Sequence, residues 1–476
     1  MDKIKKNWQI IVLILISAFL RLYKISDYME FLGDQGRDVV IIREFLRFGN
    51  LFFIGPQTSI GNMYLGPFYY YFIAPSLLLT NFSPVGPAIF IAILSVLTTF
   101  LIYKITSKYF DQSTGLIAGL LFAISPVVIK YSSFSWNPNI MPLFALLFIY
   151  YVDQKKYIFA SLAFIMCLNS HYLGLALLLP ALAIVISDIK NIKPKSFVIP
   201  ILIFVLSLTP QLLFDLKHNG QNTRALYTFF TQRETTVNIK PYKALPVLPS
   251  LFNQVTTRLL AGKNEQYGLY VSIIFFTLTI FTILKNKFNP LQKKYFYISL
   301  IWFTSGLIGL ALYKQHIYDH YFAFIYPPIF ILTAIYISKF NKLILLLCLI
   351  PLVVLAIAQN PFWWQPPRQL DTTTKIDQSI LNESNGQPFN FSLLAKMNYD
   401  PGYRYIFSEQ NAKVELLQNK ITEQLFVVCE PFQIECNPIN NSEWSIAAFG
   451  WAKIDKQWEI NGIKVFKLVH NPKGTN

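Results

Sequence analysis

Two aspartates and an arginine stand close together in residues 31–38, which read Phe-Leu-Gly-Asp-Gln-Gly-Arg-Asp. Asp34 and Asp38 are four residues apart with Arg37 between them, so the three side chains share one face if a helix begins here. A carboxylate within reach of a hydroxyl can take its proton as a general base, and a guanidinium can bind a phosphate through two parallel hydrogen bonds. The same spacing also suits a salt-bridged surface helix, so the segment permits this chemistry without requiring it.

The elements that must position this segment are apolar. The chain of 476 residues is 54% hydrophobic and 14% charged, with a mean hydropathy of +0.41, whereas soluble domains are about 25% charged. The apolar residues come in runs near the roughly 20 residues that a helix needs to cross a bilayer. We therefore expect an α-helical polytopic membrane protein. The net charge of +16 falls in short lysine clusters between the runs, which does not indicate a nucleic-acid surface.

We expect eleven membrane spans. They lie near residues 7–24, 84–105, 113–130, 137–152, 157–171, 173–188, 196–214, 267–284, 295–313, 319–338 and 341–358. The first run follows three lysines, as in a signal peptide, but the small residues of a cleavage site do not follow it, so we expect it to remain as a span.

The lysines between the spans predict the orientation. Short loops that carry Lys or Arg stay on the cytoplasmic side, which places the N-terminus inside. The inner lysines are then Lys104, Lys108, Lys155, Lys156, Lys190, Lys193, Lys195, Lys285, Lys287, Lys293, Lys294, Lys339 and Lys342. The apolar run at 66–79 would reverse every later cluster if it crossed the membrane. It is short and contains two prolines, so we expect a helix along the outer face.

Three polar regions fall outside the cytoplasmic membrane in this arrangement: a first loop at 25–83, a long loop at 215–266 and a tail at 361–476. Alternating stretches at 424–428 and 462–468 predict strands. We therefore expect the tail to form a small α/β domain beside a transmembrane catalytic domain of residues 1–360. Cys429 and Cys436 lie in the tail, where a disulfide is permitted, and the sequence leaves pairing and two free thiols open.

Polar clusters recur at the expected outer ends of the spans. They are Trp136-Asn137-Pro138-Asn139, Asn169-Ser170-His171-Tyr172, Phe214 to Asn219 with Arg224 behind it, and Asp319-His320-Tyr321. Ionisable groups near membrane depth are costly and tend to be functional, although such residues also cap helices. Their common position on the same side as Asp34 favours a shared site.

The segment Gly66-Pro67-Phe68-Tyr69-Tyr70-Tyr71-Phe72 leads through Pro84 to a span that ends in Tyr103-Lys104 and Lys108-Tyr109-Phe110. An acidic first loop, a Pro-aromatic-Tyr-Tyr helix and a following span with a basic inner end resemble the GT-C glycosyltransferases. The most similar branch contains the protein O-mannosyltransferases and the bacterial aminoarabinose-transferase-like enzymes, which depend on polyprenyl-phosphate sugars. The resemblance covers residues 1–190 by motif and the rest by layout.

The resemblance implies transfer of a sugar from a polyprenyl-phosphate carrier to a glycan, lipid or protein acceptor outside the membrane, usually with inversion. It implies that an acid of the first outer loop is the catalytic base or positions the acceptor, which matches Asp34, with Asp38 as second choice. Gln35 stands where a second acid is common, which puts a scheme with two adjacent carboxylates in doubt.

The remaining site residues follow from their positions in the outer loops and at the outer ends of the spans, and from the need for cations beside a leaving phosphate. The donor and its phosphate are expected near Arg37, His171, Arg224, His320 and Tyr321, and Tyr69, Tyr70, Asn137 and His218 are expected to line the cavity or contact the acceptor. At least one of Arg37 and Arg224 should lie in the main outer-facing cavity. Asp34 should face a cavity walled by residues 66–79 and by the surroundings of His171, rather than pair fully with Arg37, because a base locked in an ion pair accepts protons poorly.

Other chemistry lacks support. No Asp-x-Asp pair occurs, so neither a divalent metal nor another cofactor is predicted. The chain has no Gly-x-Gly-x-x-Gly for a nucleotide and no Cys/His spacing for zinc. A transporter or flippase and a polysaccharide polymerase or ligase of the cell envelope are the alternatives. A transporter would show paired halves with broken helices, and a polymerase would concentrate its functional residues in one large late loop.

Overall fold

The computed structural model describes residues 2–59, 61–231, 240–285, 287–430 and 436–471. The chain divides into two compact units. The first, here called the helical unit, contains Met1–Ile25, Asn50–Ser76 and Gly86–Gln365. The second, here called the mixed unit, contains Ser26–Gly49, Leu77–Val85 and Pro366–Asn476.

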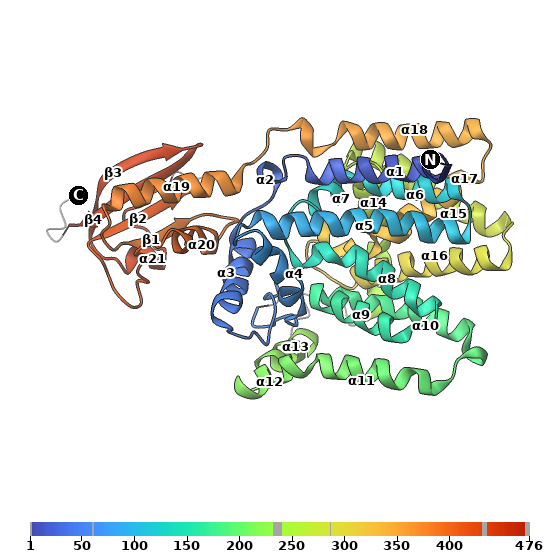
Figure 1. The fold of residues 1–476 in the computed structure, drawn as a ribbon, viewed down its shortest axis with the longest axis horizontal. Helices are drawn as coiled ribbons and strands as arrows, with labels where there is room; N and C mark the ends of the chain where they lie inside the picture. The colour runs from blue at the N-terminus through green and yellow to red at the C-terminus, as the bar shows by residue number, and fades with distance from the viewer. Residues whose placement is uncertain (1, 60, 232–239, 286, 431–435, 472–476) are drawn as a thin grey trace. The chain divides into compact units, whose positions relative to one another are not determined.

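The helical unit is a bundle in which long apolar helices run side by side (Figure 1). Its α-helices are α1 (Asp2–Leu22), α4 (Phe68–Leu79), α5 (Val85–Tyr109), α6 (Gln112–Ile124), α7 (Pro126–Tyr131), α8 (Met141–Asp153), α9 (Tyr157–Ser170), α10 (Leu178–Ser187), α11 (Val198–Ser207), α12 (Thr209–Lys217), α13 (Gln221–Thr231), α14 (Leu248–Leu259), α15 (Glu265–Lys285), α16 (Pro290–Ala311), α17 (Tyr326–Ser338) and α18 (Lys342–Ala358). Short 3₁₀ turns continue several of them, including η1 (Asn137–Ile140), η2 (Tyr172–Leu177) and η6 (Asp319–Ile325).

Each of the eleven expected spans coincides with helical structure. In the described part of the chain, five helices are long and apolar enough to cross a membrane: Val85–Tyr109, Pro194–Lys217, Glu265–Lys285, Pro290–Ala311 and Asp319–Ser338. Further apolar helices are shorter, among them Trp8–Leu22 and Phe68–Leu79. The helical class of the protein is confirmed, whereas the number of crossings stays a prediction, as does the position of α4 along the outer face.

The burial of these helices separates a central element from peripheral ones. In the 18-residue apolar window of Asp319–Ser338, 94% of the residues are buried, against 6% in that of Pro194–Lys217. Helix α17 therefore forms the core of the bundle, packed on α6 and α16. The exposed leucines and isoleucines of α11 suit contact with lipid, where apolar side chains are as favourable outside as inside.

The mixed unit combines a four-stranded sheet with helices. It contains α3 (Gly33–Phe48), α19 (Gln369–Ser384), α20 (Pro401–Glu409), α21 (Trp444–Ala447), β1 (Asn390–Leu394), β2 (Gln424–Cys429), β3 (Ala452–Ile460) and β4 (Ile463–His470). The strand order is β1-β2-β4-β3, with β1 parallel to β2 and the other pairs antiparallel. The predicted strands at 424–428 and 462–468 and the small α/β domain are confirmed.

Local sequence explains two features of this sheet. Asn461 and Gly462 both have positive φ angles, 50° and 82°, as the two-residue turn between antiparallel strands requires. The strand β2 is buried along its length, with Phe426 and Val428 in one apolar cluster and Leu425 and Val427 in another. It is therefore the central strand of a two-sided core.

The structure joins Cys429 and Cys436 in a disulfide, which answers the question that the sequence left open. Cys167 and Cys348 are free. The compact unit that holds the tail also holds α3, so the acidic segment of the first loop is built into the same body as the sheet. The division at residue 360 stays a prediction about domains.

Candidate active site

The acidic segment forms the first two turns of α3. Arg37 lies between the two aspartates: its Nη1 is 2.8 Å from Asp34 Oδ1, and its Nη2 is 2.8 Å from Asp38 Oδ1. Arg37 Nε also donates to Asp38 Oδ1 at 3.0 Å. The side chain of Asp38 is 1% exposed, whereas that of Asp34 is 39% exposed. The two carboxylates therefore differ in access, although they share one guanidinium.

Asp34 pairs with Arg37 through Oδ1 and its side chain is 39% exposed, so the expectation that it faces a cavity rather than pairs fully with Arg37 stays a prediction. Residues three apart on a helix are neighbours, and Asp34 and Arg37 have this spacing. The expected cavity shared by Asp34 and His171 stays a prediction, because the two residues belong to different units. The same holds for Arg37 in an outer-facing cavity.

In the helical unit, the structure brings together three of the predicted residues. The ring of Tyr321 lies 5.1 Å from that of His171 and 4.5 Å from that of His320, between centroids. Trp136 packs against His320 with its ring centroid at 4.3 Å, and Tyr131 lies at 5.9 Å. We call Tyr131, Trp136, His171, His320 and Tyr321 the imidazole–aromatic cluster.

Three chain segments position this cluster through backbone contacts. Asn137 Nδ2 donates to the carbonyl of Ser170 at 2.6 Å, which fixes the end of α9 beside η1. His171 accepts from the Leu173 N–H through Nδ1 at 3.1 Å, so its other ring nitrogen is the one that can carry the proton in the neutral ring. Asn137 therefore links η1 to the end of α9, next to His171.

Cations gather next to the cluster at the start of η6. Asp319 Oδ1 is 3.5 Å from Arg258 Nε, and Asp319 Oδ2 is 3.0 Å from Lys263 Nζ. Burial lowers the pKa of the Lys263 ammonium, and the neighbouring Asp319 carboxylate opposes that shift. Lys130 acts electrostatically on both Lys263 and His320. Two basic residues thus pair with one carboxylate, and Lys130 adds a third positive charge to the same region.

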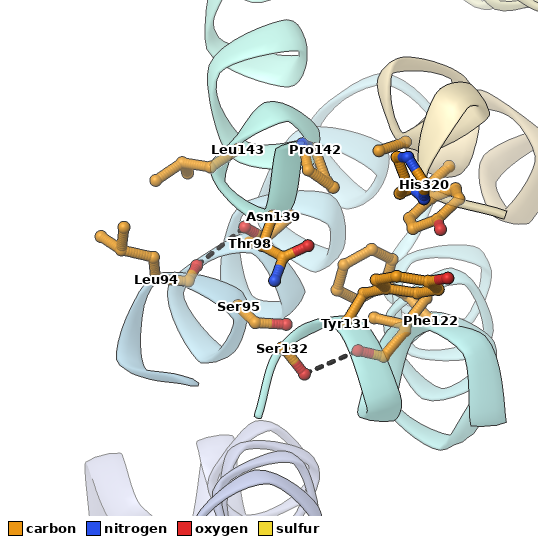
Figure 2. A pocket seen from close by; sticks show the side chains of 13 residues that line it. Leu94, Ser95, Thr98, Phe122, Tyr131, Ser132, Asn139, Pro142, Leu143 and His320 are labelled. Carbon is orange, nitrogen blue, oxygen red and sulfur yellow. Dashed lines mark hydrogen bonds between the residues drawn. The ribbon is translucent and has the colours of Figure 1, made fainter. Parts of the chain in front are cut away.

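A small cavity with both polar and apolar walls adjoins His320. Figure 2 shows Ser95, Thr98, Ser132 and Asn139 together with the ring of Tyr131 around its centre. The space open to the centre of a water-sized sphere is about 20 Å³, enough for an ordered water molecule. Among the described residues, Asn139 Oδ1 and His320 Nδ1 are buried polar atoms that lack a hydrogen-bond partner. The cavity can therefore accept a polar group.

The other predicted residues lie elsewhere in the helical unit. Tyr69 and Tyr70 are 0% and 1% exposed, and the Tyr69 hydroxyl lies 2.9 Å from Ser135 Oγ. His218 is exposed, stacks on Phe214 at 4.1 Å and lies 2.8 Å from the Phe214 carbonyl through Nδ1. Arg224 is exposed on α13 and is not among the residues that line the cavity.

Several residues of the site were not predicted. They come from three separate segments and are Lys130, Tyr131, Arg258 and Lys263. Their signal in the sequence was weak because none of them lies in a recognisable motif. Lys130 carried the clearest signal, since it ends an apolar run on the side opposite to the inner lysines.

Comparisons with known proteins address the class of this site. The family of dolichyl-phosphate-mannose-protein mannosyltransferases matches residues 65–214. ArnT from Cupriavidus metallidurans, solved with undecaprenyl phosphate, matches with a TM-score of 0.63 at 10% identity, over 97% of this chain and 98% of that chain. Over nearly its full length the chain therefore has the fold of this ArnT. The apo structure of the same ArnT gives 0.62 at 11% identity over the same shares.

Both the ArnT-like fold and the match at residues 65–214 support the resemblance to GT-C glycosyltransferases that the sequence suggested. None of the curated proteins compared with the chain matches it. The likeness to ArnT establishes a common fold over almost the whole of both chains. The reaction, its donor and acceptor and the roles of individual residues are proposed below.

Proposed function

We propose that this protein transfers a sugar from a polyprenyl-phosphate carrier to an acceptor on the outer face of the cytoplasmic membrane. The observation that carries the proposal is the full-length likeness to ArnT in a structure bound to undecaprenyl phosphate. The match of residues 65–214 to mannosyltransferases that use dolichyl-phosphate-mannose supports the same class of donor. The N-terminus is then cytoplasmic and the tail external, as the lysine-bearing loops predict.

The reaction is a single displacement at the anomeric carbon of the sugar. The acceptor oxygen forms a bond to this carbon while the bond from the carbon to the phosphate oxygen breaks. The electron pair leaves with the lipid phosphate, and the acceptor proton passes to a carboxylate of the enzyme. Attack from the face opposite to the phosphate inverts the anomeric configuration.

The difference in exposure favours Asp34 as the base. Asp34 is 39% exposed and can meet an acceptor hydroxyl, whereas Asp38 is 1% exposed and receives two hydrogen bonds from Arg37. A base must reach the proton that it removes. Asp38 is therefore assigned to orienting Arg37, and Asp34 to the proton transfer.

Because Arg37 pairs with Asp34, binding of the donor can change the state of the proposed base. The pair is partly exposed on both sides, so it contributes little stability and can exchange partners. A donor phosphate that attracts Arg37 would release the Asp34 carboxylate for proton transfer. Guanidinium groups bind both carboxylate and phosphate through paired hydrogen bonds. Arg37 can therefore pair with Asp34 in the free enzyme and with the phosphate once the donor binds.

The imidazole–aromatic cluster and its cations suit the leaving phosphate and the sugar. Within the helical unit, Lys130, Arg258 and Lys263 are positive charges of the kind that stabilise an anionic phosphate. Trp136 and Tyr321 offer flat apolar faces beside hydrogen-bonding groups, which is the composition of a ligand site. His320 is assigned to a hydrogen bond with the donor.

The test uses the purified protein in detergent or lipid discs with a panel of polyprenyl-phosphate sugars. Release of polyprenyl phosphate is followed with and without candidate acceptors, and the nucleotide sugars serve as controls. The proposal expects turnover with at least one lipid-linked sugar and none with nucleotide sugars. Turnover with nucleotide sugars alone would refute it.

A further inference from the structure

Helix α3 does not supply its own cap. Its N-cap residue is Leu32, whose side chain cannot accept a hydrogen bond, and the backbone there is extended, with φ −120° and ψ −167°. The first N–H groups of a helix need acceptors from outside the helix. Gln35 Oε1 accepts from the Leu32 N–H at 3.0 Å, which leaves the N–H of Gly33 to another residue.

Asn398 is that residue. The Gly33 N–H donates to Asn398 Oδ1 at 2.7 Å, and the Tyr399 N–H donates to the same oxygen at 2.8 Å. Asn398 thus accepts from the first helical N–H, which a side chain at the N-cap does not reach because it accepts from the second or third, and it comes from a position 365 residues further along the chain. Both residues belong to the mixed unit.

The orientation of the Asn398 amide is set from the sheet. Asn398 Nδ2 donates to Glu430 Oε1 at 2.7 Å, and the buried Tyr403 donates its hydroxyl to the same oxygen at 2.9 Å. Because the carboxylate holds the amide nitrogen, the amide oxygen faces α3. Glu430 directly follows β2, so this contact extends from the central strand to the acidic helix.

Close packing fixes α3 at the same place. A Cβ at Gly36 would lie 2.2 Å from the backbone nitrogen of Gly402, and a Cβ at Gly33 would lie 2.6 Å from the Cβ of Tyr399. Real Cβ atoms do not come so near to other atoms, so only glycine fits at either position. The first turn of α3 therefore packs directly on the backbone of residues 399–402.

The other end of α3 is held by charge. Glu409, the last residue of α20, lies 3.2 Å from Arg43 Nη1 and 2.9 Å from Arg47 Nη2. Asp34, Arg37 and Asp38 lie between this anchor and the Asn398 cap. The sheet-bearing tail thus holds the acidic helix at both ends.

We propose that Asn398 is a positioning residue for sugar transfer, which it serves by capping the turn that carries Asp34. The inference rests on the proposed function, with Asp34 as the base. Asp34 directly follows the capped Gly33, so loss of the cap frays the turn and moves the carboxylate. A displacement of about 1 Å at a catalytic group can lower turnover on the order of a hundredfold.

The cap itself is tested by amide hydrogen exchange in the full-length protein, independently of activity. Asn398→Ala should accelerate exchange of residues 33–36 on the order of fivefold, as loss of a typical helix cap does. Asn382→Ala, an exposed asparagine of α19, is the matched control and should leave these amides unchanged. Unchanged exchange at residues 33–36 in Asn398→Ala overturns the proposal, whatever the reaction is.

The positioning role is tested by kinetics in two backgrounds. Asn398→Ala should lower kcat about tenfold to a hundredfold with little change in the KM for donor, and it should have no further effect on Asp34→Asn. An equal loss of kcat in both backgrounds overturns the proposal. If Asp34→Asn alone keeps wild-type turnover, the proposed base is wrong, and the exchange result still decides whether Asn398 caps α3.

A reversed pair guards against a variant that merely misfolds. In Asn398→Asp combined with Glu430→Gln, the new carboxylate accepts from Gly33 and Tyr399. The new amide nitrogen, which takes the place of Glu430 Oε1, donates one hydrogen to this carboxylate and the other to the Tyr403 hydroxyl oxygen. The double variant should therefore recover exchange protection and kcat to within a few-fold of wild type. If both Asn398→Ala and the reversed pair lose activity equally, the hydrogen-bond account is overturned.

Discussion

Replacing Asp34 by Asn removes a proton acceptor and keeps the size and shape of the side chain. The variant also breaks the 2.8 Å ion pair with Arg37. Because both partners are partly exposed, that pair is worth about 0–1 kcal/mol of stability, so the protein should fold and bind donor normally. General-base catalysis contributes on the order of 10²–10⁴-fold, and turnover at saturating donor should fall by that factor.

Asp38→Asn is the matched comparison, since it alters the other partner of the same arginine. The Asp38 side chain is buried and accepts two hydrogen bonds from Arg37. Removing one partner of a buried ion pair destabilises the folded protein by about 3–5 kcal/mol. The cost for Asp38 should be smaller, because its partner Arg37 is partly exposed. Asp38→Asn should therefore lower the melting temperature more than Asp34→Asn does, and lower turnover less.

The assay follows release of polyprenyl phosphate by both variants at saturating donor, with the melting temperature of each measured beside it. If Asp34→Asn works at the wild-type rate while Asp38→Asn is folded and inactive, the roles assigned to the two carboxylates are reversed. If both variants keep full turnover, the mechanism based on α3 is refuted.

Three further predictions concern the topology, the tail and the donor site. Reporters fused after Lys108, Lys156 or Lys287 should read cytoplasmic and those at Asn219 or Gly402 external; a cytoplasmic tail would refute use of the donor outside. Burial raises the pKa of the Asp377 carboxyl well above its usual value, and neither of its oxygens has a hydrogen-bond partner among the described residues. Above a pH of about 4 the carboxyl is ionised in the unfolded chain but still protonated in the folded protein, so folding binds a proton. The free energy of unfolding therefore falls as the pH rises from there toward the folded pKa, by at most about 1.4 kcal/mol per pH unit. Asp377→Asn should remove that slope in thermal melts and raise the melting temperature at pH 7; an unchanged slope would contradict the assignment. His320→Ala, which removes a ring between Trp136 and Tyr321, should raise the KM for donor on the order of tenfold, while an unchanged KM would remove His320 from the donor site.

The helices could be predicted because their signal is local. Hydropathy marked each of the eleven helical segments, and alternation marked β2 and β4. The ion pair of Asp34 and Arg37 was also accessible, since their spacing makes them neighbours on a helix. The expectation that Asp34 would not pair fully with Arg37 came from mechanism rather than from that spacing, and it stays a prediction.

The contacts that could not be predicted from the sequence join segments far apart in the chain. Arg258 and Lys263 meet Asp319 across some 60 residues, and Asn398 meets Gly33 across 365. The absence of a capping side chain at Leu32 is visible in the sequence, but it does not reveal which residue replaces it. Hydrogen bonds between such positions follow from the packing of α3 on α20, which no local pattern encodes.

The central claim is that the sugar arrives on a lipid phosphate and leaves it in one step. The most direct measurement is the stoichiometry of the purified wild-type protein, in which released polyprenyl phosphate and glycosylated acceptor are quantified from one limiting pool of donor. The account predicts one lipid phosphate for each glycosylated acceptor, with inverted anomeric configuration and with both products reduced together in Asp34→Asn. Glycosylated acceptor formed without release of lipid phosphate would contradict it.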